Sequence, residues 1–95
     1  MNIYLISQNV NQDYDTYDSA VVVAADEDSA RHIHPYGCIW SSSLECWVGV
    51  DIHGHTYSTV DTAWTTPDNV KVMLIGTENG NYDTGTVICA SFNAG

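Results

Sequence analysis

Short runs of apolar residues, separated by polar segments, recur along this chain and predict β-strands. Residues 2–7 (NIYLIS) predict a buried strand, because the run is short, rich in Ile and Tyr, and closed by the polar run QNVNQD. Residues 19–25 (SAVVVAA) predict a second strand, since three consecutive valines disfavour a helix. The acidic residues 8–18 then connect the two strands as a long hairpin loop.

Two more strands are predicted in the last third of the chain. Residues 69–76 (NVKVMLIG) and 86–92 (TVICASF) are short apolar runs, and Pro67 breaks the chain before the first of them. The segment between them, TENGNYDTG, contains an Asn-Gly turn signal.

A short helix is predicted between the second and third strands. Asp26 suits the N-cap position, and the two acidic residues after it lie in the first turn, where the helix dipole favours negative charge. Arg31 lies toward the other end, where a cation is favoured, and Pro35 stops the helix, which therefore covers 27–34. Three residues would lie on one stripe of this helix: Ala30, Ile33 and His34.

The segment 36–66 is the hardest to assign, and it contains all three tryptophans. Residues 46–52 (CWVGVDI) and 55–61 (HTYSTVD) alternate between apolar and polar positions, so a small hairpin around His53-Gly54 is predicted. The tryptophans either cover the sheet as core or lid residues, or serve as anchors for a partner.

These elements predict a single α+β domain over 1–95. Its fold class is a four-stranded, mostly antiparallel sheet (ββα-ββ) with one short helix and a Trp-rich insertion between the helix and the third strand. The strands at 69–76 and 86–92 are apolar on both faces, and a two-turn helix cannot cover four strands. Either the insertion covers the remaining surface or a second copy does, in a two-fold homodimer.

The charge composition narrows the classes of partner. The chain has 12 acidic residues but only two cations, Arg31 and Lys71, and its formal net charge is -10. Direct nucleic-acid binding is disfavoured, because it depends on Lys and Arg that neutralise phosphates. The same negative field would attract a protein with a basic surface and speed the encounter.

The cysteines and the shortness of the apolar runs predict that the protein is located in a reducing cytoplasm. No apolar run approaches the roughly 20 residues that span a bilayer, and the first residues lack the pattern of a secretion signal, so no membrane contact is expected. Cys38, Cys46 and Cys89 are an odd number without CxxC spacing, which predicts free thiols; a Cys38–Cys46 bridge is the alternative.

The histidines form two H-x-H pairs that raise the question of a metal site. On a strand, His53 and His55 would face the same side and could share a metal, whereas His32 and His34 on a helix would point apart. The acidic run from Asp13 does not fit a calcium loop, since its sixth and twelfth positions are not Gly and Glu. We expect partly exposed histidines, no metal and no cofactor.

No motif predicts catalysis. A cysteine or a serine of the run 41–43 could act as a nucleophile with a histidine as base, but such residues are common in any chain. The sequence has no G-x-S-x-G elbow, no P-loop and no dinucleotide fingerprint, and almost no cation to stabilise an oxyanion. We therefore predict that the protein is not an enzyme and has no catalytic residue.

The segment 13–18 (DYDTYD) is the strongest candidate for a binding surface. Alternating carboxylates and tyrosines suit docking on an Arg- or Lys-rich patch, where tyrosines add contact area and acids add complementarity. The alternative is a solvated loop whose acids serve only solubility. With three further aromatic residues as anchors, the predicted partner-binding residues are Asp13, Tyr14, Asp15, Tyr17, Asp18, Tyr36, Trp40 and Trp47.

Three stretches, YLISQNVNQDYDTYDSAVVVAADEDSARHIHP, WTTPDNVKVMLIG and GTVICASFNAG, together resemble a family of small acidic proteins encoded by bacteriophages and prophages. The resemblance covers most of the chain and is weakest over 36–63. It implies expression in the cytoplasm of the infected bacterial host. In size and charge such proteins are similar to inhibitors of host defence, including anti-CRISPR proteins, which bind a defence protein.

The expected function is therefore that of a non-enzymatic binding protein that inhibits a host defence or regulatory protein through an acidic, aromatic surface. An extended mimic of duplex DNA is not expected, because 12 acids spread over a domain do not reach the charge density of DNA. The alternative is a small-ligand or metal-binding module, such as a sponge for nucleotide signals, with a site at a dimer interface.

Overall fold

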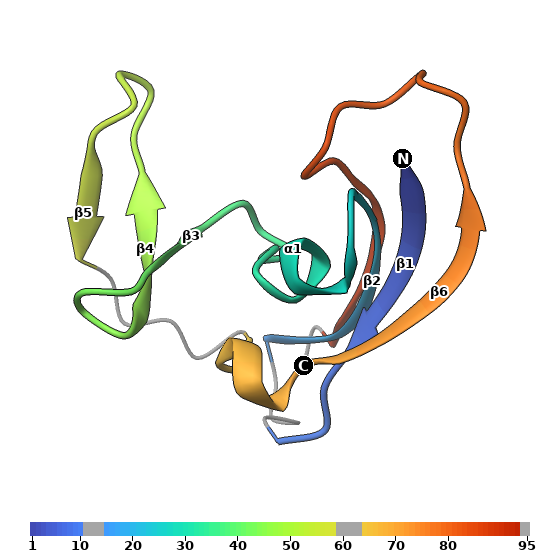
Figure 1. Ribbon diagram of the computed structural model, residues 1–95. Helices are drawn as coiled ribbons and strands as arrows, with labels where there is room; N and C mark the ends of the chain where they lie inside the picture. Colours follow the sequence, from blue (N-terminus) through green and yellow to red (C-terminus); the bar gives the residue numbers. More distant parts are fainter. Residues whose placement is uncertain (11–14, 59–63, 94–95) are drawn as a thin grey trace.

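The computed structural model shows two antiparallel sheets with a short helix between them (Figure 1). It describes residues 1–10, 15–58 and 64–93. The four-stranded sheet has the order β6-β1-β2-β7, with β1 Asn2–Ser7, β2 Thr16–Ala24, β6 Lys71–Thr77 and β7 Val87–Asn93. The three-stranded sheet has the order β3-β4-β5, with β3 Ile39–Ser41, β4 Cys46–Val50 and β5 Thr56–Ser58. The helices are α1 Glu27–Arg31 and the 3-10 helix η1 Pro67–Asn69.

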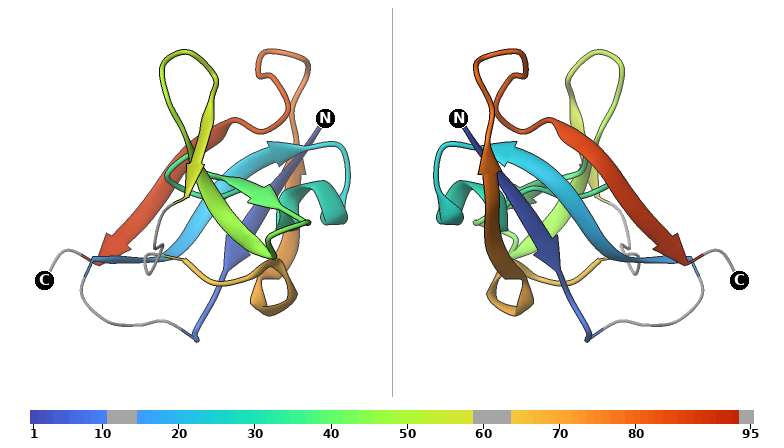
Figure 2. Two further views of the ribbon diagram at one scale, coloured as in Figure 1. Left: turned by 90° about the vertical axis from the view of Figure 1, so that its left-hand side faces the viewer. Right: turned by 90° about the vertical axis from the view of Figure 1, so that its right-hand side faces the viewer.

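The predicted class, an α+β fold with mostly antiparallel strands and one short α-helix, is confirmed. Helix α1 packs against β1, β2 and β6 of the larger sheet. Figure 2 shows the three-stranded sheet lying across the face of the four-stranded sheet that carries α1. The β4–β5 turn and the loop between β6 and β7 project at the same end of the molecule (Figures 1 and 2).

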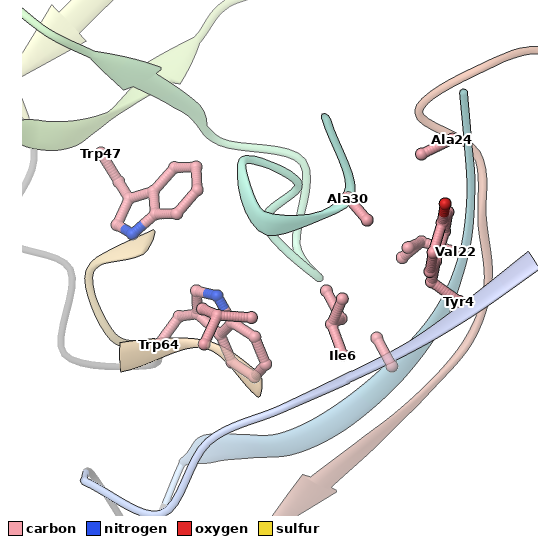
Figure 3. Packing of buried hydrophobic residues seen from close by; sticks show 9 residues of the cluster. Tyr4, Ile6, Val22, Ala24, Ala30, Trp47 and Trp64 are labelled. Atoms are coloured by element: carbon pink, nitrogen blue, oxygen red, sulfur yellow. The ribbon is translucent and has the colours of Figure 1, made fainter. Parts of the chain in front are cut away.

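The β1–β2 hairpin supplies the centre of the core. Tyr4 pairs with Val22 and Ile6 pairs with Ala20, so cross-strand neighbours on one face are buried together. Figure 3 shows Tyr4, Ile6 and Val22 on one side of Ala30 of α1 and Trp47 and Trp64 on the other. The alternation in β1 is what the sequence pattern predicted, because a period of two places every second residue on the buried face.

The second strand begins earlier than predicted, at Thr16 rather than residue 19. The added residues pair with the end of β7, Thr16 with Asn93 and Tyr17 with Phe92. Gln8 holds the same segment, since its Nε2 donates to the carbonyl oxygen of Tyr17 at 2.8 Å and its backbone N–H donates to that of Asp18 at 3.1 Å. A register shift between Tyr17 and Ser19 leaves Asp18 as a bulge opposite β7. Tyr17 and Asp18 therefore lie in a strand and not in the loop that we expected.

Helix α1 is shorter than predicted and ends at Arg31 instead of His34. The backbone N–H groups of His32 and Ile33 donate three residues back, at 3.2 Å each, so the chain tightens into a 3-10 turn. Pro35 prevents a continuation beyond His34, because it disfavours helical geometry at the residue before it. The N-cap prediction is confirmed, since the Asp26 carboxylate accepts from the Ser29 N–H at 2.8 Å.

The predicted hairpin around Gly54 is confirmed, and the sheet gains a third strand that the sequence did not indicate. Val50 pairs with Thr56 across the turn, where Gly54 has φ +81°. The extra strand, β3, has only three residues and pairs with β4. So short a segment gives no detectable periodicity, which is why it was missed.

The edge strands of the larger sheet expose apolar side chains. In β6, Met73, Leu74 and Ile75 are exposed by 60%, 56% and 50%. Three consecutive exposed residues must point to both faces of a strand, so β6 is poorly covered on either side. Dimerisation, which would cover such a strand, remains a prediction.

The two isoleucines at the extremes of burial provide a matched test of the core. Ile6 has no exposed area, whereas Ile52 is 96% exposed. Replacing Ile6 by Ala is expected to lower the free energy of unfolding by about 2–5 kcal/mol, because it removes buried methylenes and leaves a cavity. The same change at Ile52 is expected to stay within about 0.5 kcal/mol of wild type. Urea unfolding followed by circular dichroism measures both; equal losses would contradict the assignment of the core.

Candidate functional site

Aromatic side chains from separate parts of the chain lie around Tyr17, near the start of β2. The rings of Tyr17 on β2 and Phe92 on β7 meet edge to face, with centroids 4.7 Å apart. Partial burial raises the pKa of Tyr17, and its electrostatic interactions with the ionisable groups of Tyr36 and Cys38 act in the same direction. Tyr17 therefore keeps its phenolic proton at neutral pH and can donate a hydrogen bond to a ligand.

Two of the predicted carboxylates flank Tyr17. Asp15 is exposed and has φ +62°, a left-handed conformation that Asp tolerates better than most residues. Asp18 is exposed at the bulge in β2. The predicted site residues Asp13 and Tyr14 lie outside the described residues. We call one set the acidic tyrosine surface: Asp15, Tyr17, Asp18, Tyr36 and Phe92.

The other two predicted anchors, Trp40 and Trp47, lie in the smaller sheet. They pair across β3 and β4, and their rings meet edge to face with centroids 5.3 Å apart. Trp47 is 4% exposed, and its Nε1 donates to the carbonyl oxygen of Thr65 at 2.8 Å. Trp47 is therefore a core residue that offers a partner almost no surface. Trp40 is only partly buried.

His34 lies inside the molecule, so the expectation of partly exposed histidines is wrong for this residue. It is 2% exposed, and its ring lies 5.1 Å from that of Trp47 and 6.5 Å from that of Trp64. The Tyr36 N–H donates to His34 Nδ1 at 3.0 Å, which satisfies one buried ring nitrogen. Burial of this histidine joins the short helix to the smaller sheet.

A groove runs between β3 and η1, and no sequence pattern indicated it. Its larger hollow has a volume of about 320 Å³ and is lined by His32, Trp40, Glu45, Thr66, Pro67 and Asp68. An adjoining hollow of about 130 Å³ is lined by Trp40, Glu45, Cys46, Trp47, Trp64, Thr65 and Thr66. We call the two hollows together the Trp40 groove. Its walls come from segments more than 20 residues apart, so only the fold brings them together.

A third hollow, of about 220 Å³, lies between the end of α1 and the start of β7. It brings Cys38 together with His32 and His34, the residue types that nucleophilic catalysis would need. However, the hydrogen bond from Tyr36 N–H occupies the Nδ1 lone pair of His34, which a general base would have to use. The geometry therefore does not favour His34 as a base for Cys38.

The pair His53 and His55 lies in the turn between β4 and β5 and not on a strand, and their ring centroids are 6.3 Å apart. Asp51 Oδ1 accepts from the backbone N–H of both histidines at 2.9 Å, which shapes the turn. Within residues 1–10, 15–58 and 64–93, no three His, Cys, Asp or Glu side chains form a metal-binding group. Cys38, Cys46 and Cys89 form no disulfide bond in the described structure, as predicted.

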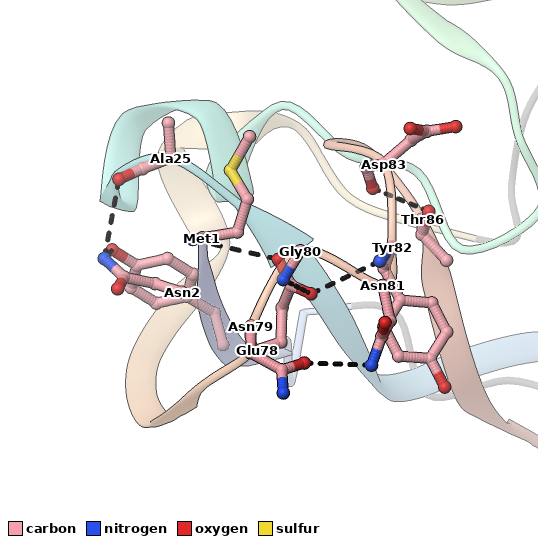
Figure 4. A network of polar contacts seen from close by, with 11 residues as sticks. Met1, Asn2, Ala25, Glu78, Asn79, Gly80, Asn81, Tyr82, Asp83 and Thr86 are labelled. Atoms are coloured by element: carbon pink, nitrogen blue, oxygen red, sulfur yellow. Dashed lines mark hydrogen bonds and ion pairs between the residues drawn. The ribbon is translucent and has the colours of Figure 1, made fainter.

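One carboxylate serves the fold rather than the surface. Glu78 Oε2 accepts from the backbone N–H of Gly80 at 2.7 Å and of Tyr82 at 3.2 Å (Figure 4). Its Oε1 lies 3.7 Å from the amino group of Met1, and the side chain is 5% exposed. Burial raises the pKa of Glu78, but the backbone donors and the ammonium group outweigh it and hold the pKa below its usual value.

No protein family, curated protein or solved structure matches this chain. In the part of the chain that the structure describes, no helix is long and apolar enough to cross a membrane. The resemblance to phage-encoded proteins therefore remains a prediction, and the function has to be inferred from the site itself.

The hydrogen bond from Trp47 to Thr65 tests how the groove is held in place. Trp47→Phe removes the donor and leaves a buried carbonyl oxygen unpaired, so the free energy of unfolding is expected to fall by about 1–3 kcal/mol. Trp40→Phe makes the same change in size at a less buried site, so a smaller fall in the free energy of unfolding is expected. Denaturant unfolding of both variants measures the difference; an equal loss would mean that the bond contributes nothing.

Proposed function

We propose that this protein is a non-enzymatic binding protein that docks its acidic tyrosine surface on a basic patch of another protein. One observation supports this most strongly. Among the described residues, no carboxylate forms an ion pair with Lys or Arg; the ion pairs there join Glu78 to the amino group of Met1 and Asp51 to His55.

Both cations lie at one place, so they cannot neutralise the rest of the surface. The Nη1 of Arg31 donates to the carbonyl oxygen of Val70 at 2.7 Å, and Lys71 is the next residue along the chain. Elsewhere the described surface carries exposed carboxylates: Asp15, Asp18, Asp26, Glu27, Asp28, Glu45, Asp51, Asp68 and Asp83. Such a field attracts basic protein surfaces and repels phosphate backbones.

The tyrosines give the acidic surface a capacity for contact that charge alone would lack. Tyr36 is 76% exposed, so most of its ring is open to contact by another molecule. Tyr17 and Phe92 add aromatic area next to it, and tyrosine contributes large contact area at low entropic cost. Acids would then steer the encounter while the aromatic rings supply contact energy.

The nature of the partner is proposed from the sequence resemblance. A phage-encoded protein would meet its partner in the cytoplasm of the infected bacterium, and a host defence or regulatory protein that binds nucleic acid offers a basic patch. Inhibition would follow if the acidic tyrosine surface occupied that patch. The alternative, a sponge for anionic nucleotides, is less well supported, because no Lys or Arg lines the hollows around Trp40 and Cys38.

Neutralising Asp15 and Asp18 tests this surface. The double variant Asp15→Asn/Asp18→Asn is expected to weaken partner binding about 5- to 30-fold, since each exposed charge pair contributes up to about 1 kcal/mol. The partner is first identified by affinity capture from host lysate, and binding of the purified pair is then measured by calorimetry at low and high salt.

The matched control is Glu27→Gln/Asp83→Asn, which removes the same charge from other exposed positions. It should retain most of the affinity, and the affinity of wild type should fall as salt rises. Equal weakening by both double variants, or an affinity that ignores ionic strength, would contradict the proposed surface.

A further inference from the structure

We infer that the Trp40 groove binds an arginine side chain of a partner polypeptide. This inference rests on the proposed function, because it assigns a specific contact to a basic partner. It concerns a different part of the molecule from the acidic tyrosine surface, so the two can be tested separately.

Trp40 forms a wall of the groove that is held in a fixed orientation. Its ring packs edge to face on Trp47, at an interplanar angle of 73°. Trp47 is in turn fixed by its hydrogen bond to Thr65 and by its contact with the buried ring of His34. An aromatic ring that is prepositioned in this way needs little ordering when a ligand stacks on it.

Two carboxylates stand at the same hollow, and no Lys or Arg lines it. Glu45 comes from the turn between β3 and β4, where its φ of +53° marks a sharp change of chain direction. Asp68 comes from η1. Both are exposed, and neither is ion-paired among the described residues, so the hollow combines an aromatic wall with two negative charges and favours a cation.

Arginine fits this combination better than lysine does. Its planar guanidinium can stack on an indole face and at the same time donate to carboxylates at its edge. The lysine ammonium is a compact, strongly hydrated charge that does neither as well. His32 also lines the hollow. Its Nδ1 donates to the Asp28 carbonyl oxygen at 2.7 Å, so in the neutral ring Nε2 is an acceptor that a guanidinium could use.

A buried donor in the adjoining hollow is a second, independent observation. Trp64 lines this hollow and is 3% exposed, and within the described residues its Nε1 has no hydrogen-bond acceptor. Buried donors are almost always paired, so this unpaired one marks the wall of the groove as incompletely satisfied.

The test is a titration of ¹⁵N-labelled protein with the peptide acetyl-Gly-Arg-Gly-amide, followed by NMR. The indole N–H signal of Trp40 is expected to shift and saturate, with a dissociation constant on the order of 1 mM. The control peptide carries citrulline, which has the shape of arginine but no charge, and should bind at least about 5-fold more weakly. The corresponding lysine peptide should fall between the two.

Variants identify the groove as the site. Glu45→Gln/Asp68→Asn should weaken the arginine peptide about 5- to 30-fold, and both positions are exposed, so the fold should be retained. Glu27→Gln/Asp83→Asn is the charge-matched control and should bind as wild type does. An unchanged indole signal of Trp47 verifies that the core is intact.

Three results would overturn the inference. They are equal binding of the arginine and citrulline peptides, equal weakening by the two double variants, and the absence of a saturable shift at Trp40 up to about 20 mM peptide. If the acidic tyrosine surface is wrong instead, Asp15→Asn/Asp18→Asn will not weaken partner binding more than its control, while the arginine peptide will still bind the Trp40 groove.

Discussion

The scarcity of positive charge is the constraint on which the rest of this structure depends. Of the two cations in the chain, Arg31 is used inside the fold, where its guanidinium bonds the Val70 carbonyl and ties the end of α1 to the start of β6. Two cations are too few to form a network of salt bridges over the surface, and most of the described carboxylates are exposed. Stability has to come from apolar burial and from hydrogen bonds to the backbone, such as those accepted by Asp26 and Glu78.

Packing between aromatic rings supplies part of this apolar burial, and it also shapes the Trp40 groove and the acidic tyrosine surface. The buried ring of His34 contacts Trp47 and Trp64, which joins the smaller sheet to the helix that covers the larger one. One consequence is a fixed Trp40 at the edge of a groove lined with carboxylates. On the larger sheet, the longer β2 carries Tyr17 beyond the hairpin to meet Phe92 of β7. Both regions combine aromatic rings with exposed acids, which is why we propose a basic partner for both.

Regular alternation made much of the fold predictable from the sequence. The residues of β1 and the N-cap of α1 follow directly from periodicity and capping, and the β4–β5 hairpin from turn chemistry. The early start of β2 could not be predicted in this way, because it depends on pairing with β7, which lies about 75 residues further along the chain. Local sequence also cannot show that Trp47 is buried in the core whereas Trp40 is only partly buried. The Trp40 groove was missed for the same reason, since Glu45 and Asp68 become neighbours only through the tertiary fold.

The most direct test of this account compares a polycation with a nucleic acid as the ligand of the intact protein. Fluorescence anisotropy of the labelled chain would be measured against a hexa-arginine peptide and against a short DNA duplex over a series of salt concentrations. The account predicts binding to the peptide that weakens as salt rises and no binding to the duplex at physiological ionic strength. Binding to the duplex with a dissociation constant below about 10⁻⁶ M under those conditions would contradict it, because this surface has almost no cations to neutralise phosphates.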